Sequence, residues 1–321
     1  MGDTMDTRQL ILDTAGKIFA DTCDKPLLDS AEQGAFAQGL WHTIVANGFH
    51  QLGTPASGTT AADLFAFLQQ AGRFAVPLPL AETLIANLWL DGGDAVSSIG
   101  VLHGERIEEA VWGHKADRVL GVAPASGEVV VADGLTVLDE ARNLAGEPCV
   151  SVACGTDATR LETDNDPYAV MALGRVNLMA GALQTILELG IQFATERAQF
   201  GRAISKFQAI QHSLAVVAAE VAASKRAADA AVDALDDARF VHEVAASKGR
   251  VGEAVGVVAE QVHQIHGAMG FTHEHRLHHY TRRAWAWRDS YGNEYFWQQR
   301  LGRHLAGLGA DRVWSFIATS A

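Results

Sequence analysis

The chain of 321 residues has few cysteines and a shortage of positive charge. Its three cysteines, Cys23, Cys149 and Cys154, are odd in number and lack metal-ligand spacing, so we interpret them as reduced cytosolic thiols. Lys and Arg number 25 against 38 Asp and Glu, and the net charge of −13 argues against nucleic acid as the main partner.

The sequence also lacks the segments that direct a protein to a membrane. No apolar run approaches the ~20 residues of a membrane-spanning helix, and the polar, acidic segment MGDTMDTRQL is unlike a secretory signal. This segment fits a myristoylation pattern only in part. Internal repeats and the Walker and Rossmann glycine signatures are missing as well. We therefore expect a cytoplasmic globular protein with no membrane partner.

Three regions of different character follow one another along the chain. Residues 1–95 show short helical patterns with one apolar face each, and Asp29 is expected to cap a helix that carries Leu40 and Trp41. Residues 96–165 change to short β-rich pieces separated by turn residues. These pieces lie at 119–123, 128–132, 135–138 and 149–153, before a polar linker from Gly155 to Pro167.

Residues 166–321 read as helical almost to the end. Four long Ala-rich helices are predicted, and such a set favours a helix bundle. The expected fold is therefore mainly α with a small β domain. An N-terminal helical domain (1–95) precedes a reduced middle sheet domain (96–165) and a C-terminal four-helix bundle (166–321).

The break between the first two bundle helices has the composition of a ligand site. Arg197, Phe200 and Gly201 lie in the break, and the amides of Gln208 and Gln211 follow. Arginine offers a fork of donors to a phosphate, phenylalanine a flat apolar face, and glycine close approach of the backbone. From this stretch alone, an elongated anionic ligand and a helix–helix corner with a surface arginine both remain open.

A second stretch ends the third bundle helix at Gln264–Thr272, with glycines at 267 and 270 beside an amide and an aromatic residue. Residues 276–303 then hold six arginines against Asp289 and Glu294, which suggests an anionic ligand or an acidic partner. For any single arginine the alternative is a solvated helix face. The six arginines are Arg276, Arg282, Arg283, Arg288, Arg300 and Arg303.

Four histidines in the same region, His273, His275, His278 and His279, invite a metal interpretation. The sequence offers them no acidic or cysteine companion at ligand spacing. We therefore expect no metal site.

Together these segments resemble the acyl-CoA dehydrogenase family. The resemblance rests on RAQFG at 197–201, FQAIQ at 207–211 and QIHGAMGFT at 264–272, followed by YGN at 291–293 and LGR at 301–303. Their order and spacing fit the family's C-terminal domain. The succession of helices, small sheet and bundle extends the resemblance over the whole chain.

The resemblance implies an FAD-dependent oxidation of an acyl-CoA thioester to its α,β-unsaturated form, with a glutamate as base and flavin as hydride acceptor. It also implies that Arg197 pairs with the FAD pyrophosphate, Phe200 packs on the cofactor and Gln208 contacts its ribityl and adenosine part. In the family these segments reach across a dimer interface to a neighbour's FAD. The implied cofactor-binding set is Arg197, Gln199, Phe200, Gly201, Gln208, Gln264, His266, Gly267, Gly270 and Phe271.

The chain departs from the family where the catalytic base belongs. The usual glutamate position is Tyr291, a poor base at a usual pKa of ~10, and the alternate position is Gly174 beside Arg175. No catalytic residue is therefore expected in this chain, and Asp289 and Glu294 are the remaining weak candidates. The family's motifs for its own flavin ring are missing between residues 96 and 165.

The segment 197–208, here called the arm, would contact a neighbour's FAD, and the chain retains it. Because the chain lacks the base, it needs a partner that supplies the glutamate and the site for the flavin ring. The resemblance therefore implies the short subunit of an α2β2 heteromer with a full-length partner, of the type that oxidises steroid side-chain CoA thioesters. Electron-transfer flavoprotein is the expected electron acceptor. A homomeric enzyme with an unusual base and a scaffold without enzymatic activity are the alternatives.

Overall fold

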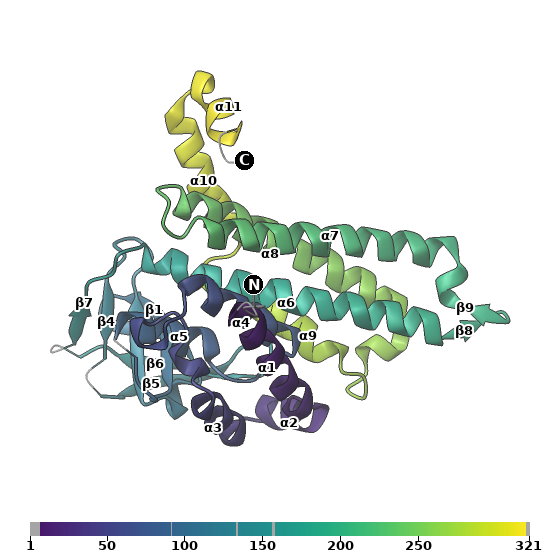
Figure 1. The fold of residues 1–321 in the computed structure, drawn as a ribbon, viewed down its shortest axis with the longest axis horizontal. Coiled ribbons are helices and arrows are strands. Elements are labelled where there is room, and N and C mark those ends of the chain that lie inside the picture. The colour runs from purple at the N-terminus through teal and green to yellow at the C-terminus, as the bar shows by residue number, and fades with distance from the viewer. Residues whose placement is uncertain (1–6, 91, 133, 156–157, 319–321) are drawn as a thin grey trace, which may run out of the picture.

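Five helices form the N-terminal part of the fold in the computed structural model, which describes residues 7–90, 92–132, 134–155 and 158–318. They pack beside the sheet and below the long helices of the bundle (Figure 1). Their bounds are α1 Thr7–Thr22, α2 Lys25–Glu32, α3 Gln38–Ala46, α4 Ala61–Arg73 and α5 Leu80–Trp89. Short 3-10 turns at Phe49–Gln51 and Pro55–Ser57 link α3 to α4.

The helix start expected at Asp29 is wrong. Asp24 caps α2 by accepting a hydrogen bond from the backbone N–H of Leu27, and Asp29 lies inside this helix. The helix with Leu40 and Trp41 begins later, at Gln38, without a side-chain cap. Several acidic residues compete for a cap here, and Asp24 has the advantage of Pro26 in the first turn. Asp29 is thereby free to point at another element.

A mixed seven-stranded sheet forms the middle of the chain, with strand order β5-β6-β2-β1-β3-β4-β7. Only β1 and β3 pair in parallel, and the other pairs are antiparallel. The bounds are β1 Ser97–His103, β2 Arg106–Val111, β3 Arg118–Val122, β4 Val129–Val131, β5 Val137–Arg142, β6 Pro148–Ala153 and β7 Thr159–Leu161. A 3-10 turn, η3, spans Gly113–Lys115.

The sequence patterns predicted β3 to β6 and missed the other three strands. β1 and β2 carry serine, glycine and charged residues that interrupt any apolar alternation, yet β1 is almost entirely buried between its neighbours. β7 falls in the expected linker, and it is a strand because its backbone pairs with β4 while its side chains stay mostly exposed.

The C-terminal half is a bundle built around α6, which packs against α4, α7, α8 and α9. The elements are α6 Pro167–Glu196, β8 Ala198–Gln199, β9 Arg202–Ala203, η4 Ile204–Lys206, α7 Gln208–Asp233, α8 Phe240–His266, η5 Gly267–Phe271, α9 Leu277–Asp289, α10 Glu294–Leu308 and α11 Ala310–Ala318. By length and composition α6 would be able to cross a membrane, which the search for apolar runs did not indicate. Of its most apolar window, 89% is buried inside the fold.

The fourth helix of the bundle is α9, and the sequence patterns missed it. The segment predicted in its place, α10, packs on α8 and continues into α11, which stands away from the bundle (Figure 1). The buried face of α9 includes Arg283, His278 and His279 beside Tyr280 and Trp287, so its polar residues hide the apolar period. The expected class, mainly α with a small β domain and a C-terminal bundle, is confirmed.

Helices α4 and α6 approach so closely that glycine is required between them. A Cβ added at Gly181 would lie 1.9 Å from the backbone oxygen of Gln69. We expect Gly181→Ala to lower the free energy of unfolding by about 1–3 kcal/mol, because the helices must separate. Urea denaturation measures this change. Gly302→Ala on α10 is the control: nothing lies within 4 Å of a Cβ there, and the alanine is expected to stabilise. Equal effects of the two variants would contradict the close packing.

Lys248 fastens α8 to the end of α9. Its fully buried Nζ donates hydrogen bonds to the carbonyl oxygens of Trp287, at 3.2 Å, and Arg288, at 2.6 Å. Burial, with a smaller effect from Arg175, lowers the pKa of Lys248 to about 7. Unfolding returns this group to a pKa of about 10.4, so between these values the unfolded chain binds more protons and the free energy of unfolding rises with pH.

We expect Lys248→Met to remove this contribution, whose slope approaches about 1.4 kcal/mol per pH unit inside the window. Urea denaturation of wild type and variant at pH 7, 8 and 9 measures the difference. The exposed Lys225, changed in the same way, is expected to leave the slope as it is. An unchanged slope in the Lys248 variant would show that this lysine remains charged in the fold.

Candidate functional site

A short hairpin projects from the end of the bundle where α6 stops and α7 begins (Figure 1). Arg197 is the first residue after α6, and β8 pairs with β9 across a turn formed by Phe200 and Gly201. Both turn residues have positive φ, +51° and +78°. Glycine tolerates this conformation readily, whereas an aromatic residue does so at a cost. The strained turn holds the Phe200 ring 92% exposed.

The hairpin and the nearby helix ends carry exposed polar side chains that contact none of the other described polar groups. Arg197, Gln199, Gln208 and Gln264 are all exposed. Across the part of the chain that the structure describes, their side chains form no hydrogen bond or ion pair. Free donors of this kind, next to an exposed aromatic ring, are suited to an anionic ligand supplied from outside.

An apolar contact anchors the hairpin to the bundle. Ala194 of α6, Ile204 of η4 and Ile265 of α8 form a small buried cluster, against which Phe207 packs. Arg202 lies over the ring of Phe207 at 4.2 Å from its centroid. These contacts bring the break after α6 and the end of α8 together at one end of the bundle, although they are more than 60 residues apart in sequence.

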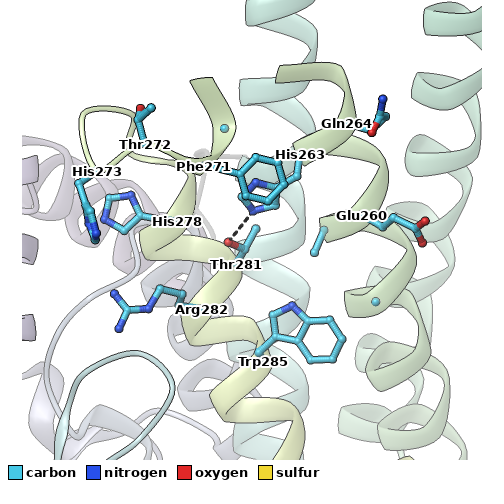
Figure 2. A pocket seen from close by; sticks show the side chains of 13 residues that line it. Glu260, His263, Gln264, Phe271, Thr272, His273, His278, Thr281, Arg282 and Trp285 are labelled. Atoms are coloured by element: carbon cyan, nitrogen blue, oxygen red, sulfur yellow. Dashed lines mark hydrogen bonds between the residues drawn. The ribbon is translucent and has the colours of Figure 1, made fainter. Parts of the chain in front are cut away.

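A groove of about 750 Å³ runs between α8 and α9 beneath the η5 turn (Figure 2). Phe271 packs against His263 in a tilted arrangement with ring centroids 4.9 Å apart, and the His263 Nε2 lies 3.1 Å from the Thr281 hydroxyl. Glu260 and Gln264 lie one turn apart on α8 at its border (Figure 2). The lining comprises Gly256, Ala259, Glu260, His263, Gln264, Gly270, Phe271, Thr272, His273, His278, Thr281, Arg282 and Trp285.

The predicted cofactor residues divide into two groups in the structure. Gln264, Gly270 and Phe271 line the groove, whereas Arg197 and the rest of the hairpin do not. Gly267 has a φ of +57°, which ends α8 and turns the chain into η5. The sequence did not indicate the groove itself, because α9, which forms one of its walls, was not predicted as a helix.

His266 is placed differently from its expected position on the adenine side. Only 3% of it is exposed, and its ring stacks on Phe193 with centroids 4.3 Å apart. Its Nδ1 lies 2.8 Å from the carbonyl oxygen of Val262. The last turn of α8 rotates this side chain toward α6, so His266 supports the corner from inside and does not line the outer surface.

The usual base position is closed. Tyr291 is 4% exposed, and its hydroxyl donates a 2.8 Å hydrogen bond to the carbonyl oxygen of Ile99 on β1. Its own carbonyl accepts a hydrogen bond from the indole of Trp297. Burial, followed by the nearby charge of Glu82, raises the pKa of Tyr291 well above its ordinary value. The phenol is therefore neutral and is committed to the sheet.

The alternate base position is closed as well. A Cβ at Gly174 would meet Ile85 at 3.2 Å and Ala81 at 3.4 Å, so α5 fills the space beside it. The neighbouring Arg175 forms a buried ion pair with Glu82 of α5. Sequence patterns did not single out Glu82, because it lies in a helix that is otherwise apolar. Its carboxylate neutralises Arg175 in the place where a base of the family would be expected.

The two weak candidates for the base, Asp289 and Glu294, lie in different surroundings. Glu294 contacts the guanidinium of Arg288 through both carboxylate oxygens, so its lone pairs are engaged. Asp289 is exposed at the end of α9 and borders a separate cavity of about 330 Å³ against the sheet. The ion pair disfavours Glu294 as a proton acceptor, and Asp289 remains the weak candidate that the sequence offered.

Most arginines of the segment 276–303 form ion pairs within the chain. Arg283 is fully buried and pairs with Glu32 of α2, as does Arg282. Arg288 and Arg300 form ion pairs with acids of their own. Arg283 therefore offers neither a surface for an anionic ligand nor a solvated helix face, whereas Arg282 is partly exposed and lines the groove.

Comparison with known proteins gives a consistent set of matches. A family model described as "Acyl-CoA dehydrogenase, C-terminal domain" matches residues 168–294. The chain is 26% identical over 300 residues to acyl-CoA dehydrogenase IpdE2 of Mycobacterium tuberculosis, covering 86% of this chain and 90% of that protein.

Two solved structures share the fold. One belongs to the ChsE4–ChsE5 complex of Mycobacterium tuberculosis, with a TM-score of 0.84 at 19% identity, covering 95% of this chain and 99% of the other. The second is a variant of the Tcur3481–Tcur3483 steroid ACAD, with a TM-score of 0.82 at 20% identity, covering 94% of this chain and 98% of the other.

We expect Tyr291→Phe to lower the free energy of unfolding by about 0.5–1.5 kcal/mol, because the buried carbonyl of Ile99 loses its donor. Urea denaturation at neutral pH measures the loss. Tyr295→Phe is the matched control, because Tyr295 is 69% exposed and is expected to show little change. A Tyr291 variant as stable as the control would mean that this hydrogen bond does not hold the turn to β1.

Proposed function

The chain belongs to the acyl-CoA dehydrogenase family, and we propose that it serves there as a subunit that binds part of a partner's FAD without supplying a catalytic base. The family supports an FAD-dependent oxidoreductase. In the proposed reaction an acyl-CoA becomes an α,β-unsaturated acyl-CoA. FAD, when bound, supplies the acceptor for the hydride, and a glutamate of the partner removes the proton.

The proposal rests on a contrast between two places. The base position at Tyr291 is buried and hydrogen-bonded, whereas the arm that carries Arg197 is exposed. The Tyr291 hydroxyl is bonded to Ile99, and Arg175 is paired with Glu82. The Arg197 guanidinium is exposed and finds no partner among the described residues. A self-sufficient enzyme would require an open base site, so the closed position at Tyr291 is the observation that favours a heteromer over a homomer.

The residues at the open end suit the non-reacting part of FAD. Arg197 offers paired donors for the pyrophosphate, and Phe200 offers an exposed ring for packing. Gln199, Gln208 and Gln264 add amides for ribityl and ribose hydroxyls. The positive φ of Gly201, with nothing within 4 Å of its Cβ position, leaves room for close approach. These side chains would bind and orient the cofactor, while the groove beside Phe271 would take its adenine end.

The partner must then provide what this chain lacks: a glutamate over the thioester and a site for the flavin ring. We propose an α2β2 heterotetramer with a full-length relative, in the cytoplasm. The fold shared with the ChsE4–ChsE5 complex supports such a pairing. The fold shared with a steroid ACAD motivates a steroid side-chain CoA thioester as the substrate class. Electron-transfer flavoprotein is proposed to reoxidise the cofactor.

Arg197→Ala tests the arm in the assembled complex. We expect FAD affinity to fall about 10- to 100-fold, which corresponds to losing hydrogen bonds to a charged phosphate. Flavin absorbance near 450 nm after desalting measures the retained cofactor. Added FAD should restore activity, because the base belongs to the partner.

Arg226→Ala, an exposed arginine of α7, provides the matched control and is expected to retain the cofactor. Size-exclusion chromatography shows whether each complex remains assembled. An intact Arg197 variant that keeps its FAD as the control does would exclude this arginine from the cofactor site.

A further inference from the structure

Two histidines of α9 and one aspartate of α2 converge where the N-terminal helices meet the bundle. His278 and His279 are buried, and Asp29 reaches them from a position about 250 residues earlier in sequence. One ligand atom from each of the three residues lies within 4.8 Å of the other two. The sequence alone offered these histidines no acidic companion, and the fold supplies one.

The hydrogen bonds of His279 determine where its proton lies. Its Nδ1 is 2.6 Å from Oε1 of Glu32. Glu32 also forms ion pairs with Arg282, at 2.8 Å, and Arg283, at 3.1 Å, and these two guanidinium groups favour its ionised carboxylate. An ionised carboxylate only accepts, so Nδ1 donates. In the neutral imidazole, Nε2 then carries the lone pair.

The same reasoning applies to His278. Its Nδ1 lies 2.7 Å from the backbone carbonyl of His275, which can only accept a hydrogen bond. Its Nε2 is buried and has no hydrogen-bond partner among the described residues. In the neutral imidazole the single ring proton lies on Nδ1. Its Nε2 therefore also presents a lone pair.

Asp29 adds a third acceptor to the two histidines. Its carboxylate oxygen and the two Nε2 atoms lie near one another, and none of the three donates a hydrogen bond to another. The Asp29 Oδ1 lies 3.1 Å from the His279 Nε2, yet this nitrogen forms no hydrogen bond of acceptable geometry. Its other carboxylate oxygen is taken by Lys25 at 2.5 Å. Two lone pairs and one carboxylate oxygen that face each other repel, unless a cation lies between them. We propose that Asp29, His278 and His279 form a binding site for a divalent transition metal, with Zn²⁺ as the best match.

The chemistry of the donors supports this choice. Two imidazole nitrogens and one carboxylate oxygen are a usual three-ligand set for Zn²⁺, which completes its coordination with water. The Glu32–His279 hydrogen bond is the contact that commonly orients a metal-bound histidine from behind. Asp29 is half-exposed, and His278 lines the groove beside His273, so the site is reachable from solvent (Figure 2). The bound ion would join α2 to α9.

Titration of the metal-free full-length chain with Zn²⁺ tests the site, using a chromophoric chelator in competition. We expect one site per chain and a rise in the midpoint of thermal unfolding when it fills. His278→Gln and Asp29→Asn should each weaken binding by at least about 10- to 100-fold, the range known for loss of a mere supporting contact. Co²⁺ in place of Zn²⁺ should give visible absorption that His278→Gln alters.

His103→Gln is the matched control, because this histidine is exposed at the end of β1 and lies outside the site. Far-UV circular dichroism of each variant without metal separates lost binding from lost folding. The proposal is overturned if wild type binds Zn²⁺ no more tightly than folded His278→Gln. That result would mean that a doubly protonated His279 simply bridges Asp29 and Glu32.

Discussion

The hydrogen bond from the Tyr291 hydroxyl to the Ile99 carbonyl joins the turn between α9 and α10 to the centre of the sheet. Around it, Arg175 lies 5.2 Å from the tyrosine ring centroid and is neutralised by Glu82, so three elements meet without a free charge. The phenol is hydrogen-bonded and the guanidinium is ion-paired, so this junction offers no free proton acceptor. A buried neutral phenol can hold helices on a sheet, but it cannot accept a proton near pH 7.

The far end of the bundle shows the reverse physical state. There the strained turn at Phe200 exposes an aromatic ring to water. The Arg197 side chain forms no hydrogen bond or ion pair with any described residue. Keeping an apolar ring exposed and a guanidinium unpaired brings a folded monomer little benefit. Both become favourable when another molecule covers them. The two ends of the chain therefore differ: the turn at Tyr291 is closely packed, whereas the hairpin at Phe200 leaves an aromatic ring exposed that another molecule could cover.

Sequence reasoning reached the fold class and the exposed motifs because those depend on local features. A glycine that breaks a helical pattern, as Gly201 does, marks a turn through its own backbone freedom, which is a local property. It failed where distant residues decide the outcome. Helix α9 has a polar pattern because Arg283 and His279 are buried against Glu32, which comes from a helix about 250 residues earlier. No local period can reveal that pairing, and the inward turn of His266 likewise depends on α6.

The central claim is that this chain holds part of a cofactor site whose reactive half belongs to another chain. The most direct measurement is the flavin content and acyl-CoA dehydrogenase activity of the purified chain, alone and after copurification with a full-length relative. The account predicts a colourless, inactive chain alone, and a yellow, active complex in which both chains are present in equal amounts. A yellow and active preparation of this chain by itself would contradict it.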